Sequence, residues 1–281
     1  MNKQNKRHRR VRKCIHGPNF LGQHFLHNKK VIEHLINMAH INAKDTVIEI
    51  GAGKGAITFS LAEKAGKVIA IEYDTALVET LRTKGEQYAN LQIINMDFLN
   101  YKLPREPFSV VANIPFSITT PILNKLLNDP ATRLQRAALI VEKRAAKRFS
   151  TYPITRPNIL IWRMWFDFCV TREIKRTCFS PPPGVDTVVL VVKKKKKTHL
   201  SPSRSSLFRR LAEYGLRYPQ LPLKYVFKDI FTAEQLKRIC QNLSLNRESP
   251  VCMLKEHEWG IIFHTMMQFV NSSRWPKHLR R

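Results

Sequence analysis

Between residues 29 and 192, short apolar runs alternate with segments of helical spacing, and this alternation constrains the fold more than any other feature of the chain. Such apolar runs are typical of strands that are covered on both faces. Strands separated by helices of about ten residues form βαβ units, whose right-handed crossovers place the strands parallel in one sheet. The sequence therefore predicts an α/β protein with a Rossmann-like, mostly parallel sheet.

The individual elements of this region can be placed from the same pattern. Asn28 precedes the first amphipathic segment and is a favourable N-cap residue. The apolar runs Ile159–Val170 and Val185–Val192 have no evident helix between them, so we expect an antiparallel pair that closes the sheet. The expected helices are Lys29–His40, Ala56–Ala65 and Thr75–Lys84, and the other expected strands are Thr46–Ile50, Lys67–Glu72, Leu91–Asn95, Ser109–Ala112 and Ala137–Val141.

The last third of the chain has a different character. The charge run Lys193–Lys197 and the Ser/Pro-rich stretch Thr198–Ser206 predict a linker. Helical spacing then recurs, and Thr232 with Gln235 matches the capping box at a helix start. The expected helices here are Leu207–Leu211, Leu236–Leu243 and Trp259–Val270. We therefore predict a catalytic α/β domain over 19–195, a small all-helical C-terminal domain over 196–275, and basic tails at 1–18 and 276–281, the first of them disordered.

The net charge indicates the kind of partner. The 281 residues include 48 Lys and Arg against 21 Asp and Glu, a formal net charge of +27. Residues 1–13 carry seven basic groups and no acid, and residues 193–281 carry 19 basic and 6 acidic groups. A balance of this kind favours an anionic partner, and nucleic acid is the first expectation.

The cysteines and the hydropathy pattern exclude several classes of protein. The chain has five cysteines and no C-x-x-C pair, which argues against a disulfide framework and a structural zinc site. We therefore expect no metal and a reducing, cytoplasmic location. No apolar run approaches the ~18 residues of a membrane span, and the N-terminus lacks a signal-peptide core, so no membrane association is expected.

A glycine-rich loop, Gly51-Ala52-Gly53, connects the first predicted strand to the next helix. Such a loop lets the backbone approach a ligand closely and brings amide donors and a helix N-terminus near it. The spacing fits neither a Walker loop nor G-x-G-x-x-G, because the third glycine, Gly55, comes one position early. A pyrophosphate ligand is therefore disfavoured.

Two acidic residues end the next two strands. Glu72, followed by Tyr73, lies 19 residues after Gly53, where an acid can accept hydrogen bonds from both ribose hydroxyls of an adenosyl cofactor. Asp97 can accept from an adenine amino group, and the backbone N–H of Phe98 can donate to the ring. The glycine loop, Glu72 and Asp97 follow or end three successive strands, and together they suggest that the cofactor is S-adenosylmethionine, whose methionine carboxylate suits the glycine loop. These residues form the predicted cofactor site.

The segment Asn113-Ile114-Pro115-Phe116 is the most specific signal in the chain. It resembles the [DNS]-[IP]-P-[YFW] signature of methyltransferases that modify exocyclic amino groups. Asn113 Oδ1 and the Ile114 carbonyl can accept the two N6–H bonds of an adenine and steer its lone pair toward a sulfonium methyl group. Pro115 fixes the turn and removes a competing donor. Phe116 can stack on the target base.

At this point the sequence resembles the erythromycin-resistance methylases (Erm), from about Asn19 to Trp275. The resemblance implies that Asn19, Leu21 and Gln23 lie over the methionine end of the cofactor, and that Phe179 is a second aromatic contact of the flipped base. Phe116 departs from the tyrosine of many members, but a phenyl face still stacks. The matching segments are Asn19–Leu26, Glu49–Gly55, Glu72, Asp97-Phe98, Asn113–Phe116, Trp162–Trp165 and Phe179–Asp186.

This resemblance implies an enzyme that uses S-adenosylmethionine to methylate, once or twice, the N6 amino group of one adenine in 23S rRNA, before ribosome assembly is complete. It also implies resistance to macrolide, lincosamide and streptogramin B drugs, and we expect a monomer. Three alternatives remain open: a small-subunit rRNA adenine dimethylase, which usually has Leu at the position of Ile114, a non-catalytic nucleic-acid-binding relative, and a DNA adenine methylase, which usually has Asp at the position of Asn113.

Overall fold

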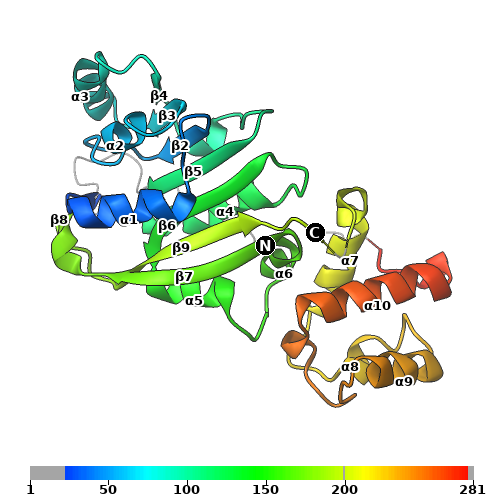
Figure 1. Ribbon diagram of the computed structural model, residues 1–281. Helices are drawn as coiled ribbons and strands as arrows, with labels where there is room; N and C mark the ends of the chain where they lie inside the picture. Colours follow the sequence, from blue (N-terminus) through cyan, green and yellow to red (C-terminus); the bar gives the residue numbers. More distant parts are fainter. Residues whose placement is uncertain (1–22, 199, 278–281) are drawn as a thin grey trace, which may run out of the picture.

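The computed structural model describes residues 23–198 and 200–277 (Figure 1). Its main sheet has seven strands in the order β4-β3-β2-β5-β6-β9-β7, and β9 runs antiparallel to both of its neighbours. The strands are β2 Thr46–Ile50, β3 Lys67–Glu72, β4 Leu91–Asn95, β5 Phe108–Asn113, β6 Leu134–Glu142, β7 Phe166–Ile174 and β9 Thr187–Lys194. A second, two-stranded sheet pairs β1 Phe25–Leu26 with β8 Phe179–Ser180.

Ten α-helices lie within the described residues. They are α1 Lys29–Ala39, α2 Thr58–Ala62, α3 Thr75–Gly85, α4 Thr119–Leu127, α5 Lys143–Ser150, α6 Pro157–Trp165, α7 Ser205–Gly215, α8 Leu223–Val226, α9 Ala233–Asn242 and α10 Glu256–Phe269. The predicted α/β architecture with a mostly parallel sheet and a helical C-terminal region is confirmed. None of the described helices combines the length and the apolar character that crossing a membrane requires.

Helices cover both faces of the main sheet because alternate strand residues point to opposite sides. Val47 and Val68 belong to the apolar cluster under α1 and α2, whereas Ile48 and Ile69 belong to the cluster under α4, α5 and α6. Local signals begin several helices as predicted. The Asn28 side chain accepts a hydrogen bond from the backbone N–H of Val31, and the capping box at the start of α9 is present.

One predicted strand is partly a helix, and helices α4, α5 and α8 and strands β1 and β8 have no predicted counterpart. The run expected as a strand from Ile159 is helix α6 as far as Trp165, and only then strand β7. Nearly every residue of α6 is buried, so the run shows no period that separates a helix from a strand. Helix α4 carries Pro121 in its first turn, where proline is tolerated, and α5 buries only Ala145, Ala146 and Phe149. Helix α2 is shorter than the predicted Ala56–Ala65.

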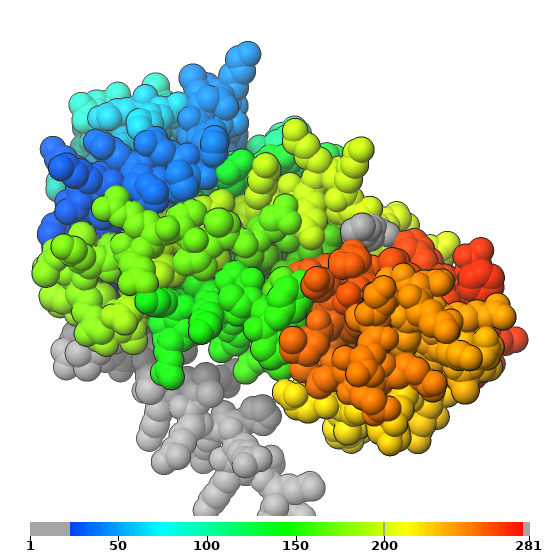
Figure 2. All heavy atoms as spheres, turned by 60° about the horizontal axis from the view of Figure 1, so that its bottom comes forward, coloured from blue at the N-terminus to red at the C-terminus, as the bar shows by residue number. Residues whose placement is uncertain are grey.

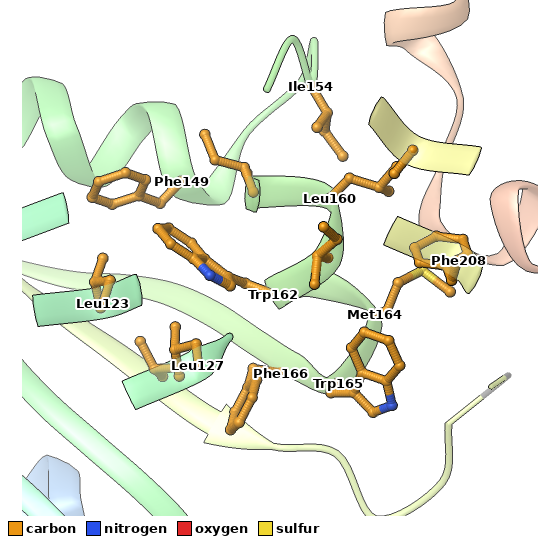
Figure 3. Close-up of a cluster of buried hydrophobic side chains, with 14 of the residues drawn as sticks. Leu123, Leu127, Phe149, Ile154, Leu160, Trp162, Met164, Trp165, Phe166 and Phe208 are labelled. Atoms are coloured by element: carbon orange, nitrogen blue, oxygen red, sulfur yellow. The ribbon is translucent and has the colours of Figure 1, made fainter. Parts of the chain in front are cut away.

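Aromatic side chains join the C-terminal helices to the catalytic part. Trp162 and Trp165 of α6 are buried; Trp162 packs edge-on against Phe149, and Trp165 against Phe208 of α7 (Figure 3). Phe208 in turn packs on Phe263 of α10, with ring centroids 5.5 Å apart. The helices form a distinct lobe in Figure 2, yet one continuous apolar cluster runs from the sheet into this lobe.

A polar cluster reinforces this junction. The carboxylate of Glu256, at the start of α10, accepts hydrogen bonds from Arg163 Nε of α6 and from the Tyr152 hydroxyl. The Arg163 guanidinium also lies over the Tyr152 ring, 4.4 Å from its centroid, and donates to the Thr151 carbonyl at 3.0 Å. Burial and the bond to Glu256 raise the pKa of Tyr152 well above its ordinary value, so the hydroxyl stays a donor.

Candidate active site

The predicted site residues of the main sheet meet at one edge. Strands β2, β3, β4 and β5 are parallel, so their carboxyl ends lie side by side. Gly51 follows β2, Glu72 ends β3, Asp97 lies just after β4, and Asn113 ends β5. In open α/β sheets this edge is where ligands bind.

The glycine loop is built for close approach. Gly53 has a φ of +57°, and a Cβ at this position would lie 3.1 Å from the Phe25 ring. Three of the loop amides, which we expect near a ligand, have partners within the protein. Gly51 and Ala52 donate to the Ile71 carbonyl at 2.8 and 3.3 Å, and Gly53 donates to Glu72. The loop can therefore favour ligand binding through the space that its missing side chains leave, and not through free N–H groups of these three residues.

Glu72 is buried and acts as a brace for this loop. One carboxylate oxygen accepts from the Gly53 N–H at 2.8 Å, and the other accepts from the N–H groups of Tyr73 and Asp74 at 2.9 and 3.0 Å. A carboxylate has about four acceptor positions, so part of its capacity stays open for the predicted ribose hydroxyls. The Tyr73 side chain is 60% exposed beside it.

Glu49 is a buried carboxyl that the sequence did not single out. Its side chain is 1% exposed, and it accepts a hydrogen bond from the Thr58 hydroxyl of α2 at 2.5 Å. Burial, opposed by this hydrogen bond and assisted by the charge of Glu72, raises its pKa to about 8. Glu49 is therefore mostly a neutral acid at pH 7. A single polar residue within an apolar strand is the signal that could have found it.

Asp97 has a local structural role as well as its predicted one. One of its oxygens accepts from the Leu99 N–H at 2.8 Å and so caps a short 3₁₀ turn. The Phe98 ring is buried, and Lys125 Nζ lies 5.8 Å from its centroid. The predicted contacts of Asp97 and Phe98 with an adenine ring stay predictions.

The Asn113 amide has one partner and one vacant acceptor. Its Nδ2 donates to the backbone carbonyl of His24 at 2.7 Å. Its Oδ1 is buried and has no hydrogen-bond partner among the described residues. Ile114 is buried, Pro115 is exposed, and the partly exposed Phe116 ring stacks near-parallel on the His24 ring, 5.9 Å between centroids. The Thr119 hydroxyl donates to the Phe116 carbonyl at 3.0 Å and holds the turn.

The small β1/β8 sheet brings a distant segment to this turn. Leu26 pairs with Phe179, and His24 Nδ1 lies 2.8 Å from the Pro181 carbonyl oxygen. The backbone of Phe179 therefore lies near the site. Its side chain, however, belongs to the apolar cluster under α1, and the residue is only 2% exposed. In this structure the ring is a core side chain. Gln23 lies two residues before β1, whereas Asn19 and Leu21 lie outside the described residues.

The model of the ribosomal RNA adenine dimethylase family matches residues 16–268. The chain belongs to this family. It is 46% identical to a protein named rRNA adenine N-6-methyltransferase from Bacillus licheniformis, over 94% of this chain and 92% of the relative, and equally to one of the same name from Bacillus anthracis.

A more distant relative and two solved structures are also similar to this chain. A ribosomal RNA small subunit methyltransferase A from Clostridium acetobutylicum is 33% identical over 67% of this chain and 71% of its own length. Among solved structures, the 23S rRNA methyltransferase ErmE superposes with a TM-score of 0.78 at 22% identity, covering 87% of this chain and all of ErmE. A dimethyladenosine transferase from Plasmodium falciparum gives 0.72 at 22% identity, over 88% and 99% of the two chains. These two likenesses confirm the fold.

The chain is thus an S-adenosylmethionine-dependent methyltransferase of the N6 amino group of rRNA adenine. Its site fits this chemistry in two respects. A Cβ at Gly51 would meet only Pro115 Cδ, at 3.9 Å, so the loop leaves space beside this residue, and the vacant acceptor of Asn113 suits an amino group. Among the described residues, no cluster of three His, Cys, Asp or Glu could hold a metal ion.

Proposed function

We propose that this enzyme dimethylates the N6 amino group of one adenine in 23S rRNA, and that this modification blocks macrolide, lincosamide and streptogramin B drugs. The observation that supports this substrate is the extent of the likeness. The Bacillus proteins named rRNA adenine N-6-methyltransferase match 94% of the chain. The small-subunit methyltransferases match 60–69% of it, at 31–35% identity.

The alternative, a small-subunit rRNA adenine, rests on that shorter likeness. The relatives named small subunit methyltransferase match stretches of 174 to 206 residues, which leaves a substantial part of this chain outside the likeness. The fold and the Asn113 turn are consistent with either substrate, because the chemistry at N6 is the same. The choice therefore depends on which RNA the surface accepts.

The vacant acceptor of Asn113 carries the proposed mechanism. S-adenosylmethionine supplies the electrophilic methyl group when it is bound. In the first transfer, Asn113 Oδ1 and the Ile114 carbonyl accept hydrogen bonds from the two N6–H groups and turn the nitrogen lone pair out of conjugation with the ring. The N6 cation that forms is acidic and releases its proton to solvent, and one N6–H remains for the second transfer. Because the Nδ2 side of the amide is bound to the His24 carbonyl, which can only accept, the amide keeps Oδ1 toward the substrate.

The other residues of the site hold and orient the reactants. Phe116 offers a stacking face and stabilises the positive charge that grows on N6. Glu72, Tyr73, Asp97 and Phe98 are proposed contacts of the cofactor at the ends of β3 and β4. A Cβ added to Gly51 of the glycine loop would lie 3.9 Å from Pro115 Cδ, so the proposed cofactor and base sites adjoin. A base stacked inside a duplex cannot reach Asn113, so the adenine must be unpaired or flipped.

The C-terminal lobe offers a surface suited to RNA. Tyr218 and Tyr225 are 59% and 53% exposed, and a cation lies over each ring, Arg217 at 5.6 Å and Lys224 at 4.8 Å from the centroid. Exposed aromatic rings beside cations are typical of surfaces that bind unpaired nucleotides. In Figure 1 this lobe lies at the end of the sheet opposite β8.

The proposal is tested by methyl transfer from labelled S-adenosylmethionine to deproteinised 23S and 16S rRNA in parallel, with the modified adenine mapped by primer extension. We expect label in 23S rRNA and one strong stop, and none with the Asn113→Ala protein. Label confined to 16S rRNA would assign the enzyme to the small subunit. Expression in a susceptible bacterium should raise macrolide tolerance only if the 23S position is the target.

A further inference from the structure

His24 connects the three chain segments that build the base site. Its backbone carbonyl accepts from Asn113 Nδ2 at 2.7 Å, and its ring Nδ1 lies 2.8 Å from the Pro181 carbonyl oxygen. Its ring also stacks on Phe116 with an interplanar angle of 18°. Among the described residues, His24 is thus bound to the predicted hydrogen-bonding residue, to the predicted stacking residue, and to the segment that carries Phe179.

The acceptor of the base site is buried in this structure. Asn113 Oδ1 has less than 1 Å² of exposed surface and no partner among the described residues. A buried acceptor without a partner is costly, and an acceptor that must receive an N6 amino group cannot stay covered. Asn113 itself ends a strand paired with β6 and cannot recede, whereas the partly exposed His24 ring makes a single hydrogen bond, through Nδ1.

We propose that His24 is a positioning residue that covers the target-adenine site in the free enzyme and gives up its place on Phe116 to the incoming base. This inference rests on the proposed role of Asn113 and Phe116. The two parts of His24 act differently. Its backbone carbonyl keeps the Asn113 amide in the accepting orientation throughout, while its ring occupies a stacking face that would otherwise be wetted.

The proposal predicts a competition between the His24 ring and the base. The ring stacks on Phe116, and an incoming adenine must replace that stack before its N6 group reaches Asn113 Oδ1. Removing the ring in His24→Ala leaves the backbone carbonyl, and therefore the amide orientation, in place. An aromatic pair contributes enough that its removal should tighten adenine binding roughly two- to ten-fold.

The experiment compares two RNAs that differ only at the target position, on whichever rRNA fragment the wild-type enzyme methylates. One carries adenine and the other is abasic there. For His24→Ala we expect the dissociation constant of the adenine RNA to fall roughly two- to ten-fold, while that of the abasic RNA stays at the wild-type value. Both dissociation constants are measured on a fragment of the rRNA that the wild-type enzyme methylates. A wrong choice between 23S and 16S rRNA would therefore appear in the wild-type methylation assay and would leave the ratio of the two constants unaffected.

Two control variants distinguish the effect of removing the His24 ring from a general change in the structure of this segment. His27→Ala changes an exposed histidine of the same segment whose backbone N–H bonds to the Cys178 carbonyl, and it should leave both constants unchanged. His24→Phe keeps an aromatic cover but loses the bond to Pro181, so its ratio should stay near the wild-type value. Weaker adenine binding in His24→Ala, or equal changes for both RNAs with S-adenosylmethionine affinity intact, would overturn the proposal. So would the same gain in His24→Phe.

Discussion

Replacing Glu49 by Gln should change how the stability of this enzyme depends on pH. The Glu49 carboxyl is fully buried on β2, and its pKa rises from 4.5 to about 8 in the folded state. The folded protein therefore holds a proton that the unfolded chain releases between these two values. The Glu49 contribution to the free energy of unfolding is then greatest below pH 4.5 and is lost as pH rises toward 8.

The magnitude follows from the width of that interval. At about 1.4 kcal/mol per pH unit, the interval from 4.5 to about 8 corresponds to roughly 4–5 kcal/mol. Gln keeps an oxygen that accepts from the Thr58 hydroxyl but carries no titrating proton. We therefore expect Glu49→Gln to match the wild type within about 1 kcal/mol near pH 5 and to exceed it by several kcal/mol near pH 9.

The assay is urea unfolding at a series of pH values from 5 to 9, analysed as the difference between variant and wild type, so that all other groups cancel. Glu63→Gln, which removes an exposed carboxylate just after the same helix as Thr58, is the matched control. Thr58→Val should extend the decline to higher pH, because loss of the hydroxyl raises the pKa of Glu49 in the folded state and leaves that of the unfolded chain unchanged. A difference curve for Glu49→Gln that is flat from pH 5 to 9 would refute this account.

Four further predictions concern the site, the domain junction and the N-terminal tail. Asn113→Ala should lower kcat at least a hundred-fold with little change in the dissociation constant of S-adenosylmethionine, measured by calorimetry, because its acceptor acts in the transition state. Gly53→Ala should weaken that affinity instead, because a Cβ 3.1 Å from the Phe25 ring and a φ of +57°, which costs an alanine about 1–2 kcal/mol, together force the loop to shift. Glu256→Gln should lower the free energy of unfolding by about 1–3 kcal/mol at pH 7, because it weakens the bond to the buried Arg163. Burial opposes the ionised form of Glu256, but the bond from Tyr152 and the nearby cations hold its pKa below the usual value, so this loss should shrink as pH falls through that pKa in urea titrations at pH 3–7. Deleting residues 2–13 should flatten the salt dependence of RNA binding by about 0.7–0.9 in log–log slope per lost phosphate contact, without moving the methylated adenine in primer extension.

Much of the fold could be predicted because its signals are local. Strands β2, β3 and β4 begin and end at the predicted residues, since each is a short run rich in Val and Ile. The caps of α1 and α9 depend on side chains three residues from the backbone they bind. Helix α6 was mistaken for a strand because burial on every side erases the period that distinguishes the two.

The sequence by itself determined which residues meet at the carboxyl edge of the sheet, because parallel βαβ topology follows from the order of strands and helices. It placed Gly53, Glu72, Asp97 and Asn113 there. Their partners were decided only by tertiary structure. Gly53 binds Glu72 across 19 positions, and Asn113 binds the carbonyl of His24 across 89.

The environment of each group was decided at the same level. The burial that raises the pKa of Glu49 and the burial that takes the Phe179 ring into the core both come from segments packed against them. Residue identity and spacing fix which chemistry a chain can offer at a strand end. Solvent exposure, electric field and hydrogen-bond partners are set by neighbours distant in sequence, so they exist only once the chain has packed.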